Sequence, residues 1–149
     1  MQSEKKMTEA LQRTAMRSLE TLCFVFSAPI INEEEHSKTG SLAVEVGFQG
    51  TRAGSMIFEV SEDIVSVLAG NMIGEGKITK EQERDAIGEI ANVICGNFLP
   101  EAFGKGLVFE IAAPVVLQKI KKHPSALQVH LAVETGRVDL ALCFDKPSG

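Results

Sequence analysis

Three polar side chains recur at a spacing that brings them together on one predicted helix. Asp85, Glu89 and Asn92 occupy positions i, i+4 and i+7, and at about 100° per residue they share one narrow face. Gly88 flanks this face, and Gly96 lies on it one turn further on. The face therefore presents two carboxylates, one amide and two positions without a side chain.

This face allows two kinds of chemistry. Carboxylates one helical turn apart can share a divalent cation, and an amide can both donate to and accept from water without adding charge. Two carboxylates and one amide are few for a dedicated metal site, so the sequence predicts no metal of its own. A solvated polar surface is the simplest interpretation of the spacing alone, since every amphipathic helix has a polar side.

Other arrangements that carry chemistry are missing from the sequence. It has no G-x-x-x-x-G-K-[ST] loop, no G-x-G-x-x-G fingerprint and no G-x-S-x-G elbow. The histidines are scattered, and each is predicted to lie at the surface: His36, His123 and His130.

The segment around the polar face resembles the CheC, CheX and FliY phosphatases of bacterial chemotaxis. Asp85-x3-Glu89-x2-Asn92 matches their D/S-x3-E-x2-N signature, and the wider runs that resemble CheX are Asn71-Met-Ile-Gly74 and Asp85-Ala-Ile-Gly-Glu-Ile-Ala-Asn-Val-Ile-Cys-Gly-Asn97. Pro114 lies one residue closer to the motif than the family's proline, a minor departure in a loop. The order of predicted elements is also similar, so the likeness covers most of the chain.

The motif occurs once. Of all the glutamates, only Glu89 has Asp or Ser four residues before it and Asn three residues after it. On the first predicted helix, Glu20 has Met16 and Cys23 at those places. CheC-type members usually carry two copies, so a single copy in a chain of this length is similar to CheX.

The resemblance implies a phosphatase that hydrolyses the phosphoaspartate of a CheY-like response-regulator receiver domain. It assigns Asn92 to positioning the attacking water and Glu89 to pairing with the lysine beside the receiver's phosphorylation site. Asp85 either assists docking or only favours the start of its helix. Gly88 and Gly96 would let the receiver surface approach closely.

The resemblance further implies a homodimer without a cofactor of its own, because Mg²⁺ would belong to the receiver. One alternative is a non-catalytic receiver-binding or flagellar-switch module on the same fold. Another is a sensor domain that binds a small ligand or a metal ion.

Periodicity predicts the elements that must position this face. Helical spacing of apolar residues predicts helices over residues 3–27, 62–73 and 79–104. Alternation predicts two hairpins from strands 42–48, 53–60, 127–133 and 138–144, plus a strand over 107–113, while 115–123 is ambiguous between strand and loop. The expected fold is α+β: one domain, residues 1–149, with an antiparallel-rich sheet packed against helices in a CheC/CheX-like sandwich.

Local signals set the expected helix ends. Pro29 is predicted to stop the first helix, and Ser61 to cap the second. Thr79 and Gln82 form a capping-box signature for the third, whose last part Pro100 should kink or shorten.

Composition limits the remaining possibilities. The formal charge is −5, and no basic stripe is present, so nucleic acid is a poor partner. Three cysteines far apart in an apolar context predict buried free thiols in a reducing compartment. No apolar run approaches the length of a membrane span, and the first residues lack the apolar core of a signal peptide, which predicts a cytoplasmic protein.

Overall fold

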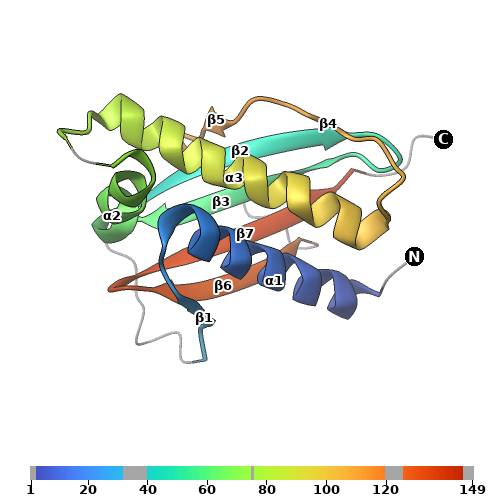
Figure 1. Ribbon diagram of the computed structural model, residues 1–149. Helices are drawn as coiled ribbons and strands as arrows, with labels where there is room; N and C mark the ends of the chain where they lie inside the picture. The colour runs from blue at the N-terminus through green and yellow to red at the C-terminus, as the bar shows by residue number, and fades with distance from the viewer. Residues whose placement is uncertain (1–2, 32–39, 75, 120–125, 146–149) are drawn as a thin grey trace.

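The computed structural model describes residues 3–31, 40–74, 76–119 and 126–145. One antiparallel sheet carries α1 and α3 side by side across one face, with α2 at one end (Figure 1). The elements in chain order are α1 (Glu4–Cys23), β1 (Ser27–Pro29), β2 (Ser41–Gln49), β3 (Gly54–Ser61), α2 (Glu62–Ile73), α3 (Lys80–Phe103), β4 (Glu110–Ile111), β5 (Val115–Val116), β6 (Leu127–Val133) and β7 (Gly136–Phe144). The predicted α+β class is confirmed.

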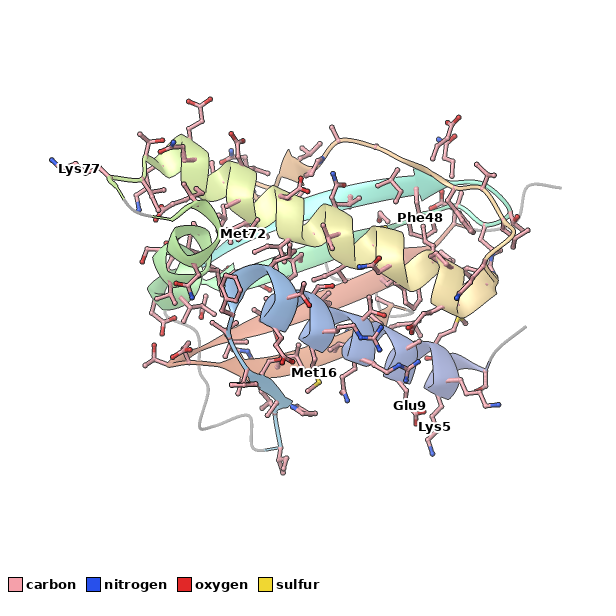
Figure 2. All side chains as sticks on the ribbon, viewed as in Figure 1. Lys5, Glu9, Met16, Phe48, Met72 and Lys77 are labelled. Atoms are coloured by element: carbon pink, nitrogen blue, oxygen red, sulfur yellow. The ribbon has the colours of Figure 1, made fainter. Side chains whose placement is uncertain are left out.

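The two predicted hairpins form the centre of the sheet. The strand order is β1-β6-β7-β3-β2-β4, and β5 also pairs with β2. Alternate residues of the central strands are buried beneath the helices, as the alternation predicted: Val44, Val46, Met56, Phe58, Val129, Leu131, Val138 and Leu140. The opposite faces of the helices are polar, and Lys5 and Glu9 of α1 point away from the sheet (Figure 2).

The helix that carries the motif begins where its capping box predicts. The Gln82 backbone N–H donates to Thr79 Oγ1 at 3.1 Å, and the Thr79 N–H donates to Gln82 Oε1 at 2.9 Å. Its apolar side has no solvent exposure at Ile87, Ile90, Ile94 and Phe98. Pro100 does not shorten it, since α3 continues to Phe103. The apolar side therefore fixes which way the polar side faces.

The prediction for the end of the first helix was wrong. α1 ends at Cys23, before the predicted end at residue 27, because Phe24 takes a left-handed conformation with φ 56°. The chain then extends, so that Ser27–Pro29 pairs with β6 as an edge strand. Asn71 of α2 also donates to the Cys23 carbonyl at 2.8 Å. The end of α1 is thus set by tertiary contacts that no local sequence signal shows.

The predicted strand over 107–113 was too long. Only Glu110–Ile111 and Val115–Val116 pair, and both pair with β2. Pro114 lies between them and has no N–H to donate, so it interrupts the ladder. β4 and β5 therefore form two short pieces along the edge of the sheet that contacts α3.

The expected side-chain cap at Ser61 is also absent. Ser61 occupies the N-cap position of α2 but makes no capping hydrogen bond. Its hydroxyl instead accepts a hydrogen bond from the backbone N–H of Arg137 at 2.9 Å. The serine therefore joins the start of α2 to β7.

Several expectations fall on residues outside the described ranges: those for His36 and His123, and part of the ambiguous segment over 115–123. Among the helices that the structure describes, none combines the length and apolar content that a membrane crossing needs.

Candidate functional site

A depression of about 280 Å³ lies between α3 and the β2–β5 edge of the sheet. Its walls come from Val44, Arg84, Asp85, Gly88, Glu89, Asn92, Pro114 and Val116. Four of the five predicted site residues are in this set. The fifth, Gly96, lies further along the helix beside Ile111.

Both carboxylates of the site face solvent without a partner. Asp85 and Glu89 are exposed, and neither forms an ion pair or hydrogen bond with the described part of the chain. Two unpaired negative charges on adjacent turns of one helix repel each other modestly. A positively charged group from another molecule would therefore be attracted to this face.

Asn92 has an unsatisfied polar atom in its side chain. Its Oδ1 atom is buried and has no hydrogen-bond partner within the described residues. An unsatisfied buried carbonyl of this kind costs about 1–3 kcal/mol. The residue as a whole is half-buried and lines the depression. A donor supplied from outside would recover the lost hydrogen bond.

Gly88 is covered by the chain's own loop. A Cβ atom at Gly88 would lie 3.1 Å from Pro114 Cβ and 3.3 Å from Pro114 Cγ, closer than ordinary contact. A Cβ atom at Gly96 would lie 3.6 Å from Ile111 Cδ1, an ordinary distance. The group that approaches Gly88 in the structure is thus Pro114, and contact of either glycine with a partner stays a prediction.

The position of Asp85 bears on its two possible roles. The first turn of α3 already contains Glu81 and Glu83, and the helix-dipole effect falls off within that turn. Asp85 lies beyond it, so the dipole accounts for little of its presence. It also lines a second depression of about 290 Å³ with Met72, Ile73, Gln82 and Ala86, where α2 meets α3 near the labelled Met72 (Figure 2).

Sequence reasoning missed part of the site wall. Arg84 directly precedes Asp85, and helical geometry places it about 80° from Asn92, on the side of Gly88. That spacing was a usable signal. The sequence marked Pro114 only as a loop proline in the family resemblance, and it gave no signal for Val116, because the packing of the β4–β5 segment brings both to α3.

Another polar cluster lies on the sheet face that the helices leave uncovered. Arg137 donates through Nε and Nη2 to Asp139 at 3.0 and 2.6 Å, and His130 Nδ1 lies 2.6 Å from Asp139 Oδ1. His130 is part-exposed, in line with its predicted surface position, but the Arg137–Asp139 pair is buried. Within the described ranges, no group of three His, Cys, Asp or Glu side chains could hold a metal ion.

The fold and the site together define a class of protein: an α+β sandwich whose polar helix face opens to solvent. The family model described as "Chemotaxis phosphatase CheX" matches residues 42–131, a span that includes α3 and the whole depression. The chain therefore belongs to the CheX family, and the resemblance seen in the sequence is confirmed. Curated protein sequences give no significant match.

Solved structures share the fold. The chemotaxis protein CheX from Vibrio vulnificus is 22% identical with a TM-score of 0.77, and the match covers 97% of this chain and 100% of that one. CheX from Desulfovibrio desulfuricans is 19% identical with a TM-score of 0.76, over 94% and 99% of the two chains. A CheX–CheY–BeF3–Mg²⁺ complex from Borrelia burgdorferi is 20% identical with a TM-score of 0.68, over 93% and 97%.

Proposed function

We propose that this protein is a phosphatase that hydrolyses the phosphoaspartate of a CheY-like receiver domain. Membership of the CheX family supports the reaction class. The similar protein from Borrelia burgdorferi was solved with CheY, BeF3 and Mg²⁺, and BeF3 is a chemical analogue of a phosphoryl group. We assign the whole chain, residues 1–149, to one domain with this activity.

The observation that carries the proposal is the unsatisfied oxygen of Asn92 beside two unpaired carboxylates. Hydrolysis of an acyl phosphate needs a water placed in line with the phosphorus, and positioning is the main requirement. Asn92 turns its amide toward the bound receiver and holds that water. The water oxygen bonds to phosphorus, the P–O bond to the acyl group breaks, and aspartate leaves as its carboxylate.

Glu89 and Asp85 bind the partner in this proposal. Glu89 pairs with the lysine beside the receiver's phosphorylation site, which anchors α3 and draws that lysine from the phosphoryl group. Asp85 assists docking from the ridge between the two depressions. Mg²⁺ is held by the receiver, and this chain supplies no cofactor.

The decisive experiment follows the loss of phosphate from a phosphorylated receiver. Asn92→Ala should lower the rate about 100-fold or more, as removal of a group that acts in the transition state does. Glu89→Ala should mainly weaken binding. Asn97→Ala and Glu81→Ala are matched controls, because both residues are exposed on α3 away from the depression.

The non-catalytic alternative predicts a different result. A receiver-binding or flagellar-switch module would bind the receiver carrying BeF3 and Mg²⁺ yet leave its dephosphorylation unchanged. Unaltered decay with wild-type protein across several receivers would overturn the phosphatase proposal.

We also propose a homodimer, as the family resemblance implies. Support comes from the edge strand β1, beside which Phe24, Phe26 and Ile31 are 75%, 82% and 99% exposed. Apolar side chains next to an open strand edge favour association. A Phe24→Asp/Phe26→Asp variant should sediment as a monomer, whereas Val108→Asp, which is 83% exposed in the loop before β4, should not change the mass. A wild-type monomer at all concentrations would contradict the proposal.

A further inference from the structure

Arg84 is the one cationic side chain on the described wall of the depression between α3 and β5. It is exposed, and it forms no ion pair or hydrogen bond with the described part of the chain. Pro114 packs on Gly88 and so lies on the same side of the helix face as Arg84, while Glu89 lies on the far side of Asn92. Arg84 and Glu89 thus flank the amide with opposite charges.

Pairing with neighbours on the helix does not account for an arginine here. The i+4 neighbour is Gly88, which has no side chain, and the i−4 neighbour is Lys80, which is also a cation and pairs with Glu83. Glu81 at i−3 is the nearest carboxylate at helical spacing, yet no pair with it forms. The arginine is left available to another molecule.

We propose that Arg84 binds an anionic oxygen of the phosphorylated receiver and so selects the phosphorylated partner. This inference rests on the proposed function. A face with Asp85 and Glu89 alone would repel a phosphoryl group and the carboxylates that hold Mg²⁺, since like charges at short range disfavour approach. A guanidinium stays charged at every relevant pH and fits both oxygens of a phosphoryl group or a carboxylate.

The anionic oxygen has two sources in the receiver, and they give different results. A phosphoryl oxygen is present only in the phosphorylated or BeF3 form, so Arg84→Gln would weaken binding of that form alone and raise KM, with kcat lowered as well where the contact strengthens in the transition state. A carboxylate of the receiver is present in both forms, so Arg84→Gln would weaken both about equally; that result would support the contact but overturn the selection of the phosphorylated partner. A purely structural role would move neither, because the side chain is exposed and unpaired.

The experiment compares wild-type protein, Arg84→Gln, Arg84→Lys and the control Lys77→Gln. Lys77 is an exposed cation in the loop before α3, and its side chain points away from the body of the protein (Figure 2). Arg84→Gln should lower kcat/KM about 10- to 100-fold, the effect of losing one charge-assisted hydrogen bond. Arg84→Lys should recover part of the loss, and Lys77→Gln should stay within about twofold of wild type.

Binding titrations complete the test. They measure the affinity of each variant for the receiver in Mg²⁺ alone and for the receiver in BeF3 with Mg²⁺. If Arg84→Gln matches Lys77→Gln in both rate and affinity, the inference is wrong even though the phosphatase proposal stands. If wild type binds the BeF3 form without catalysis, the phosphatase proposal fails while loss of affinity in Arg84→Gln still supports this contact. If wild type neither binds nor hydrolyses, both are overturned.

Discussion

Pro114 packs on Gly88 so closely that a methyl group on the glycine would lie 3.1 Å from the proline Cβ atom. The proline interrupts the pairing of β4 and β5 with β2, and the glycine gives it a place on α3. One wall of the depression depends on this contact. The glycine in the motif therefore has a structural role within the chain, whatever it contributes to a partner.

Gly88→Ala and Gly96→Ala should consequently change the free energy of unfolding in opposite directions. An alanine in a helix is favoured over glycine by about 0.5–1 kcal/mol, and Gly96→Ala should gain that amount because its new Cβ finds an ordinary 3.6 Å contact. Gly88→Ala should lose stability, since overpacking costs about 1–3 kcal/mol, and its phosphatase activity should fall as the wall shifts. Urea unfolding of both variants measures the difference.

A double-mutant cycle identifies the cause of that loss. Pro114→Gly removes both ring atoms that the new methyl group would meet. The penalty of Gly88→Ala should vanish in the Pro114→Gly background. An equal penalty in both backgrounds would show that the contact is not responsible.

Asn92 should be needed for activity although it lowers the stability of the free protein. Its buried, unpaired oxygen lowers the stability of the free protein, so Asn92→Leu should be as stable as wild type or more stable by about 1 kcal/mol. The same variant should lose phosphatase activity. Asn97→Leu, at an exposed position of the same helix, measures the part of the gain that comes from helix propensity alone. A clear loss of stability in Asn92→Leu would mean that the amide is satisfied in the free protein.

The sequence was sufficient for the elements that have a strong period. α2 runs over Glu62–Ile73 as predicted, and both hairpins form with their apolar residues inward. The capping box at Thr79 fixed the start of α3, and four of the five site residues meet because one helix carries them. Local spacing decides such features, so local reasoning finds them.

The features that failed depend on contacts between distant segments. The end of α1 depends on Asn71 and on pairing of β1 with β6. The position of Pro114 depends on Gly88 and on two short strands that share one edge of β2. In each case the segments in contact are far apart in the sequence.

The cysteines should react in a set order. Burial raises the pKa of Cys23 to about 11 and that of Cys95 to about 12. Cys143 also has a raised pKa, through burial and the nearby charges of Asp145 and Glu45, but it is partly exposed. Iodoacetamide at pH 8 should therefore modify only Cys143 in the folded protein, and slowly, because the thiolate is the reactive form. Mass spectrometry before and after unfolding checks this, and rapid modification of Cys95 in the folded state would contradict it.

Asp63 should make the protein less stable in acid. Hydrogen bonds from the Ser61 and Thr135 hydroxyls lower the pKa of Asp63 below its ordinary value of 3.8, and Thr135 Oγ1 donates to Asp63 Oδ2 at 2.8 Å. Because the folded pKa is the lower one, this stabilisation is complete above about pH 4 and is lost as the pH falls through the folded value. The carboxylate is exposed, so the effect is modest.

Unfolding free energies at pH 6 and pH 3 test this linkage. Thr135→Val removes one donor and Asp63→Asn removes the titrating group. Both should therefore reduce the difference in unfolding free energy between pH 6 and pH 3. Glu62→Gln is the matched control, because Glu62 is the neighbouring exposed carboxylate in the first turn of α2, and it should leave the difference close to that of wild type. An Asp63→Asn variant with the full wild-type acid sensitivity would show that other carboxylates carry it.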